Sequence, residues 1–215
     1  MASENYHQNP TAVRRRKQAL DFILKQYREN PFNPDDPFIP LLALTYFDRF
    51  FSRLLMEVKR EPSHAFLSFN LVDIPLQVTM LIAISCLSLA WKMRTVRFNL
   101  RELLDSLNFR NLPVVEVKKM ELRIFSTLDW RMRSTTAFCF IDFFVSLLNI
   151  DNDSKQDLKR RVLNNVVKKM YTVIEFTKFR PSIVAASALI AESTSSGPRI
   201  DLRQAFAPYV NMVKS

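Results

Sequence analysis

Apolar side chains recur at three- and four-residue steps along most of the chain, which is the spacing of one face of an α-helix. The first such stripe follows Thr11, a residue that suits a helix N-cap, and stops at the dipeptide Asn30-Pro31. A second stripe follows the proline-rich segment 31–40. The pattern therefore predicts two amphipathic helices joined by a loop.

The segment from Asp73 to Lys92 is apolar on nearly every side, which is typical of a helix at the centre of a core. Pro75 suits its first turn. The most apolar part, residues 76–91, is about 16 residues long and contains polar side chains, whereas a membrane span needs about 20 predominantly apolar residues. We therefore predict a core helix and no membrane.

Two more helices complete the first half of the chain, and the second half repeats the plan. Further helices are predicted over residues 99–107, 113–128, 136–148, 154–176, 181–192 and 201–214. The third helix of each half opens with Pro-x-x-Val, at Pro75–Val78 and at Pro181–Val184, which suggests an internal duplication. We predict an all-α fold with a disordered N-terminus over residues 1–10 and two domains over residues 11–132 and 133–215.

One charged residue interrupts the apolar stripe of each of the first two helices. Arg16 lies in the first stripe and Asp48 in the second. An isolated buried charge costs several kcal/mol, whereas a paired and hydrogen-bonded one is tolerated. The sequence therefore suggests an ion pair between the two helices. The alternative is that both side chains reach the solvent at the edges of their stripes.

The chain of 215 residues contains a single glycine, Gly197. Glycine-rich phosphate-binding loops need several, because only a residue without Cβ lets the backbone approach a phosphate closely. Tight hairpins and many β-bulges also use glycine. The count therefore excludes the common nucleotide-binding loops and favours an all-α fold.

The net charge is +10, from 31 lysines and arginines against 21 acidic residues, which suggests nucleic acid as a partner. However, the only dense basic run is Arg14–Lys17, and the other cations are scattered and often lie beside acids. Nucleic acid is therefore not the expected partner. The basic run matches a weak nuclear-import pattern, or it forms one face of a helix.

No pattern typical of catalysis or metal binding is present. His7 and His64 lie in polar segments, and neither they nor Cys86 and Cys139 have the spacing of zinc ligands. Two isolated cysteines indicate a reducing compartment. We expect no enzyme activity, no metal and no cofactor. Solvated loops and helix caps account for the paired carboxylates, namely Asp35 with Asp36 and Asp151 with Asp153.

Two further charges lie beside apolar residues. Lys92 ends the central apolar helix next to Met93, and Glu121 lies in the predicted helix 113–128 with Phe125 one turn further on. An apolar surface with a few charged groups is typical of a protein-binding site. The alternative is an ordinary helix-terminal lysine and an ordinary exposed glutamate.

Several segments resemble the cyclin box in order and spacing. The matching segments are Arg15–Lys25, Leu44–Ser52, Cys86–Met93 and Met120–Met132. The continuation at Thr136–Phe144 and Phe179–Ser182 resembles the second box of plant D-type cyclins. This resemblance extends from about residue 13 to the end of the chain. It implies two tandem five-helix domains, the second about one helix short at Ser215.

The resemblance assigns the five hallmark positions of the first box to Arg16, Asp48, Leu81, Lys92 and Glu121. In the family, the arginine and aspartate positions form a buried structural pair, and the leucine position belongs to the core of the box. The lysine and glutamate positions contact a kinase.

The function that the resemblance implies is that of a non-catalytic regulatory subunit, which binds and activates a cyclin-dependent kinase at the G1/S transition. Lys92, Glu121, Met93 and Phe125 would contact the region of the kinase's C helix and hold it inward. Kinase inhibitor proteins are further expected partners, and the nucleus, together with the cytoplasm, is the expected compartment. Two alternatives remain: a cyclin-fold protein associated with nucleic acid, and a degenerate cyclin that binds a kinase without activating it.

Two features depart from the family pattern. Neither cysteine lies in a Leu-x-Cys-x-Glu segment, through which many D-type cyclins bind retinoblastoma-related proteins, so direct binding of those proteins is not expected. The substrate-docking surface is usually apolar, but Arg15 and Gln18 stand beside Ala19 here, and Phe22 replaces the common tryptophan. Docking of basic-x-Leu motifs is therefore expected to be weak or altered.

Overall fold

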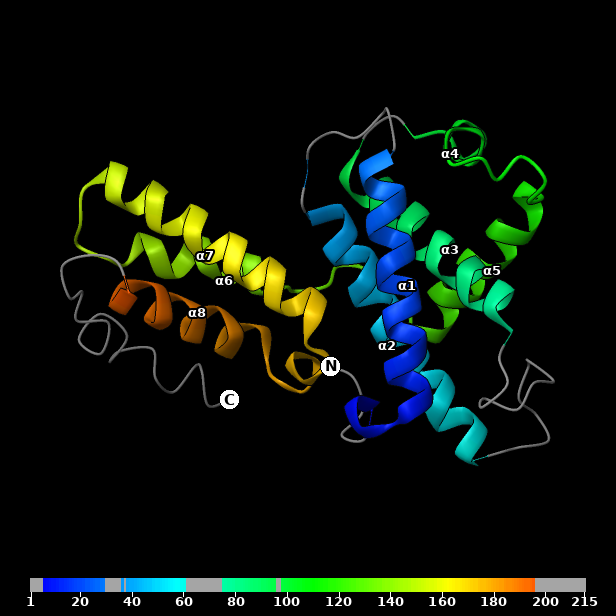
Figure 1. The fold of residues 1–215 in the computed structure, drawn as a ribbon, viewed down its shortest axis with the longest axis horizontal. Helices are drawn as coiled ribbons and strands as arrows, with labels where there is room; N and C mark the ends of the chain where they lie inside the picture. Colours follow the sequence, from blue (N-terminus) through cyan, green and yellow to red (C-terminus); the bar gives the residue numbers. More distant parts are fainter. Residues whose placement is uncertain (1–5, 30–35, 37, 61–74, 96–97, 196–215) are drawn as a thin grey trace. The chain divides into compact units, whose positions relative to one another are not determined.

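The computed structural model describes residues 6–29, 36, 38–60, 75–95 and 98–195 (Figure 1). Within these ranges the chain forms eight α-helices and two 3-10 turns and contains no strand, which confirms the predicted all-α class. The chain divides into two compact units, Met1–Ser134 and Thr135–Ser215. The predicted domain boundary, after residue 132, lies two residues before this division.

The described part of the first unit contains five α-helices: α1 (Pro10–Glu29), α2 (Phe38–Arg60), α3 (Leu76–Arg94), α4 (Leu100–Ser106) and α5 (Val114–Thr127). Helix α3 packs against α1, α2 and α5 and lies at the centre of the unit (Figure 1). Every residue from Ile82 to Trp91 is buried. By length and composition α3 is apolar enough to cross a membrane, but its burial identifies it as the core helix of this unit.

The segment before α1 differs from the predicted disorder over residues 1–10. A 3-10 turn, η1, covers Tyr6–Gln8, and the Tyr6 side chain is buried. Two effects at Tyr6 favour this ordered turn. The ring is removed from water, and the hydroxyl donates a hydrogen bond to Asp48 Oδ1 at 2.8 Å. The apolar periodicity of helix α1 gave no sign of this contact.

Asn99 caps α4, because its Oδ1 accepts a hydrogen bond from the Arg101 N–H at 2.9 Å. Three other described helices also begin with a side-chain cap. Asn9, rather than the predicted Thr11, caps α1, because its Oδ1 accepts a hydrogen bond from the Ala12 N–H at 3.0 Å. Asp36 Oδ1 accepts from the backbone N–H of Phe38 in the first turn of α2, at 2.9 Å. The third is the helix of the second unit that starts at Asn152, where Asp151 Oδ1 accepts from the Ser154 N–H at 2.8 Å. The capping role predicted for the loop carboxylates is therefore present at Asp36 and Asp151.

The second unit contains α6 (Ala137–Ser146), α7 (Asn152–Thr172), η3 (Ile174–Lys178) and α8 (Pro181–Ser195). Helix α8 packs on both α6 and α7, as α3 packs on α1 and α2. The predicted helix 154–176 is wrong at its end, because Val173 is extended and separates α7 from η3. Three successive β-branched residues, 172–174, disfavour a continuous helix there. The predicted helix 201–214 and Gly197 lie outside the described residues.

Helices α4 and α5 end without glycine. The residue after each C-cap has a positive φ, in the left-handed region that glycine usually occupies. It is Asn108 after α4, with φ 58°, and Asp129 after α5, with φ 53°. After α5 the next residue, Trp130, also has a positive φ, of 60°. Its N–H donates to the carbonyl of Phe125 at 2.9 Å, and the Asp129 N–H donates to the carbonyl of Ser126 at 3.1 Å. These two bonds form a Schellman motif at the end of α5.

Candidate functional site

The structure brings Lys92 and Glu121 together. Lys92 lies in the last turn of α3 and Glu121 in the middle of α5, and the two helices pack against each other. Lys92 Nζ donates to Glu121 Oε1 at 2.7 Å and to Oε2 at 2.6 Å. Ser88, one turn earlier on α3, donates from Oγ to Glu121 Oε1 at 2.6 Å. The sequence indicated the two charges but not their pairing or the role of Ser88.

The two charges of this pair differ in exposure. The Glu121 side chain is 7% exposed and that of Lys92 is 35% exposed. The alternative of an ordinary exposed glutamate is therefore wrong. The ring of Phe98 lies 5.5 Å from Lys92 Nζ, within the range of a cation–π contact. An ammonium group has three donors, so Lys92 can bind one acceptor beyond the two oxygens of Glu121.

Apolar side chains lie beside the pair in the sequence and along α5. Met93 follows Lys92 and is exposed, and Phe125 is half-buried one turn after Glu121. Phe125 stacks on Trp130 with 5.3 Å between the ring centroids, and Trp130 is 67% exposed. Trp130 was not among the predicted site residues, because its position depends on the positive φ values after α5 rather than on helical periodicity.

Arg16 and Asp48 form a buried pair between α1 and α2. Arg16 Nε donates to Asp48 Oδ1 at 3.0 Å and to Oδ2 at 3.2 Å, and both side chains are less than a tenth exposed. The alternative, in which both charges reach the solvent, is wrong. Burial raises the pKa of Asp48, while the Arg16 charge and the Tyr6 hydrogen bond act in the opposite direction. Burial and the Asp48 charge raise the pKa of Tyr6, which keeps its hydroxyl a donor.

Leu81 differs from its predicted place in the core. It is partly exposed, and the fully buried stretch of α3 begins at the next residue, Ile82. The backbone carbonyl of Leu81 accepts a hydrogen bond from Ser85 Oγ at 2.7 Å. Its side chain therefore lies at the margin of the core.

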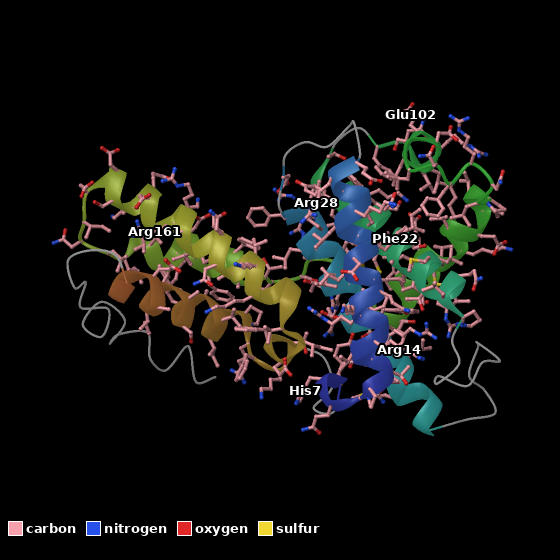
Figure 2. All side chains as sticks on the ribbon, in the orientation of Figure 1. His7, Arg14, Phe22, Arg28, Glu102 and Arg161 are labelled. Carbon is pink, nitrogen blue, oxygen red and sulfur yellow. The ribbon has the colours of Figure 1, made fainter. Side chains whose placement is uncertain are left out.

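The four residues at the predicted docking surface lie on α1. Ala19 is fully buried, and Arg15 is 7% exposed with one Nη donating to Gln18 Oε1 at 3.0 Å. Phe22, labelled in Figure 2, is half-buried and packs edge-on against Phe109, with 5.6 Å between the ring centroids. Only parts of Gln18 and Phe22 are therefore accessible at these positions.

The described residues contain no group of three or more His, Cys, Asp or Glu that could hold a metal ion. Cys86 is fully buried in α3, and burial raises the pKa of its thiol, so the reactive thiolate is disfavoured. Cys139 is exposed. His64 lies outside the described residues.

The arrangement of helices in this chain has a counterpart among solved structures. The structure superposes on the crystal structure of a viral cyclin from herpesvirus saimiri with a TM-score of 0.67, over 94% of this chain and 80% of that one. The sequence identity is only 16%, so this similarity defines the fold alone. Residues 1–133, more than half of the chain, match the family model of the cyclin N-terminal domain. The chain therefore belongs to the cyclin family.

The chain is also similar to D-type cyclins of plants. A putative cyclin-D6-1 of Arabidopsis thaliana is 30% identical over 83% of this chain and 53% of its own length. Cyclin-D3-1 of Oryza sativa subsp. japonica is 33% identical over 82% of this chain and 46% of its own length. The chain thus spans about half the length of these relatives.

Proposed function

We propose that this chain is a regulatory subunit that binds a cyclin-dependent protein kinase and activates it, promoting the G1/S transition. The observation that supports this most directly is the Glu121 carboxylate, which is buried, held by Ser88 and Lys92, and followed on α5 by the partly exposed Phe125. Burying a charge costs stability, so a buried carboxylate near exposed apolar groups favours a role in recognition.

The chemistry of the surface suggests how it acts. The remaining donor of Lys92 can bind a carbonyl or carboxylate of the kinase, while Met93 and Phe125 supply apolar contacts. Packing of this surface against the kinase's C helix would hold that helix inward, where the kinase's own lysine–glutamate ion pair forms. In this proposal the kinase carries out phosphoryl transfer and this chain sets its conformation.

The test is co-purification with a plant cyclin-dependent kinase, followed by phosphorylation of histone or a retinoblastoma peptide. Truncating one side of a desolvated charged contact costs about 2–5 kcal/mol, so Lys92→Ala/Glu121→Ala should weaken kinase binding about 30-fold or more. The matched control is Glu116→Ala/Lys119→Ala, which removes an exposed pair 2.9 Å apart on α5. It should leave binding unchanged.

Different outcomes separate the candidate functions. Equal binding by the wild type and the Lys92/Glu121 variant would exclude this surface as the interface. A stable complex with no rise in kinase activity at saturating protein would favour a degenerate cyclin. No complex with any plant cyclin-dependent kinase would contradict the proposal as a whole.

We further propose the nucleus, together with the cytoplasm, as the compartment, and kinase inhibitor proteins as additional partners of the complex. These proposals rest on family membership. Arg15 and Arg16 are buried, so the basic run Arg14–Lys17 is only half accessible in the folded chain. A fluorescent fusion carrying Arg14→Ala/Lys17→Ala should therefore distribute like the wild type, and loss of nuclear signal would show that the run acts in import.

A further inference from the structure

The turn after α5 holds two consecutive non-glycine residues in the left-handed region. Asp129 has φ 53° and Trp130 has φ 60°. This conformation brings Cβ close to the carbonyl oxygen, so it is rare for residues other than glycine, asparagine and aspartate, and unusual for a bulky residue such as tryptophan. Such a backbone persists when surrounding structure supports it.

Two arginines of α2, one helical turn apart, contact the backbone on each side of these residues. Arg53 donates to the carbonyl of Thr127, the last residue of α5, and to Asp129 Oδ2 at 2.7 Å. Arg49 donates to the carbonyl of Arg131 at 2.9 Å. The chain is thus tied to α2 immediately before and immediately after the strained residues.

The contacts of Arg53 exceed those of an ordinary surface ion pair. Arg53 and Asp129 are 39% and 59% exposed, and a simple ion pair at that exposure contributes little. Here the same guanidinium also binds a carbonyl at the C-terminal end of α5, where backbone acceptors lack helical partners. Arg49 makes a second bond as well, to Ser134 Oγ at 2.7 Å.

The turn determines where an exposed aromatic surface lies. We use the term aromatic platform for Phe125 and Trp130, whose rings stack at an interplanar angle of 24°. Phe125 and Trp130 occupy the two positions, C3 and C″, whose side chains a Schellman motif brings into contact at a helix end. Phe125 lies one turn from Glu121 on α5, so the platform continues the surface of the Lys92–Glu121 pair. An unsupported turn would release Trp130 from this arrangement.

We propose that Arg53, assisted by Arg49, is a positioning residue for this surface. Arg53 holds Asp129 and Trp130 in the left-handed conformation and thereby presents the aromatic platform to the apolar side chains of a kinase helix. The identity of the partner rests on the proposed function, whereas the effect on Trp130 is a property of the free chain. The two parts can therefore be tested separately.

The experiment compares the wild-type full chain with four variants. Arg53→Gln removes the guanidinium charge that contacts Thr127 and Asp129. Asp129→Gly supplies a residue that adopts positive φ without a Cβ clash. The double variant Arg53→Gln/Asp129→Gly asks whether Arg53 becomes dispensable once the strain at residue 129 is removed. Arg28→Gln, at an exposed position of α1, is the control for loss of an arginine charge.

The first measurement is fluorine NMR of the chain labelled with 5-fluorotryptophan. The chain has two tryptophans, and the buried Trp91 serves as an internal reference for the fold. Arg53→Gln should shift and broaden the Trp130 signal while leaving that of Trp91 in place. The double variant should return the Trp130 signal towards its wild-type position, and Arg28→Gln should change neither signal.

The second measurement is the Kd for a plant cyclin-dependent kinase. Arg53→Gln should raise the Kd about tenfold, because the fraction of chains with an ordered platform falls and apparent affinity falls with it. The double variant should recover to within about threefold of the wild type. Arg53→Lys, which keeps the charge beside Asp129 but lacks the planar fork of arginine, should give an intermediate Kd and provides a milder variant if Arg53→Gln does not fold.

The outcomes separate the role of Arg53 in ordering Trp130 from the role of this surface in binding a kinase. An unchanged Trp130 signal in both single variants, Arg53→Gln and Arg53→Lys, would show that Arg53 does not order Trp130, whatever the result for kinase binding. A displaced Trp130 signal with wild-type kinase affinity would overturn the positioning role, as would a double variant that recovers neither quantity. If no form of the chain binds a kinase, the proposed function and this partner fail together, while the fluorine signals still decide whether Arg53 orders Trp130.

Discussion

The carboxylate of Asp48 accepts hydrogen bonds from two residues that come from separate segments of the chain. Arg16 approaches from α1 and Tyr6 from η1. The apolar stripes of α1 and α2 predicted the Arg16–Asp48 pair, because each stripe contained one charge of opposite sign. Tyr6 could not be predicted in this way, because it lies outside any periodic segment and its burial depends on a tertiary contact.

Removing parts of this network should reduce stability in a graded way. Tyr6→Phe keeps the buried ring but removes one donor from Asp48, and we expect a loss of about 1–3 kcal/mol in the free energy of unfolding. Arg16→Met leaves the Asp48 charge buried and unpaired, and should cost about 3–5 kcal/mol. Urea unfolding followed by circular dichroism measures both. Lys17→Met, at an exposed position of the same helix, should change stability little.

The single glycine correctly indicated an all-α fold, yet the chain still needs left-handed residues at two helix ends. At the end of α4, the Asn108 N–H donates to the carbonyl of Asp105 at 3.2 Å, and the Phe109 N–H donates to that of Leu104 at 2.8 Å. Asparagine and aspartate tolerate this conformation better than most residues. Hydrophobic periodicity does not register them, so the sequence did not reveal where Phe109 and Trp130 would lie.

At the scale of the elements, periodicity predicted every described α-helix, and the errors occur at helix ends. The proline-rich segment 31–40 was expected to be a loop, but α2 begins at Phe38 and includes Pro40. A proline in the first turn removes an N–H that has no helical partner there. The pairing of α3 with α5 at Lys92 and Glu121 could not be predicted from periodicity, because that requires knowing which helix faces pack together.

The N-cap of α7 provides a prediction on pH dependence. Hydrogen bonds from Ser154 hold the pKa of Asp151 below its ordinary value of 3.8. A lowered carboxyl pKa means that its stabilising contribution is complete above pH 3.8 and is lost as the pH falls through the folded-state pKa. Asparagine is also a good cap but carries no charge. The Tm of the wild type should therefore exceed that of Asp151→Asn at neutral pH, and the difference should close in acid.

Thermal unfolding followed by circular dichroism between pH 2 and pH 7 measures this difference. Asp151→Ala is the second variant, because alanine offers no side-chain acceptor to the first turn. Its Tm deficit should persist at low pH, where that of Asp151→Asn has closed. A constant deficit for Asp151→Asn across the whole range would show that the charge of Asp151 does not stabilise α7.

At the scale of the whole molecule, the net charge of +10 is concentrated in part on the outer face of α1. Four exposed cations lie at helical spacing along that face, about 21 Å from end to end, and Figure 2 shows Arg14 and Arg28 near opposite ends of the helix. These cations are Arg14, Lys17, Lys25 and Arg28. The exposed Asp21 lies in the middle of the same stripe. A narrow stripe interrupted by an acid should attract phosphates weakly and without sequence preference.

This charge distribution predicts how the chain behaves towards DNA and tests the nucleic-acid alternative. A duplex mobility shift at about 20 mM salt should disappear by about 200 mM, with a log–log slope no steeper than about −4, since at most four cations contact phosphates. Lys17→Gln/Lys25→Gln should reduce that slope by about 2. Binding that persists at physiological salt, or a slope that does not respond to these substitutions, would mean that another surface recognises nucleic acid and would favour the alternative function over kinase regulation.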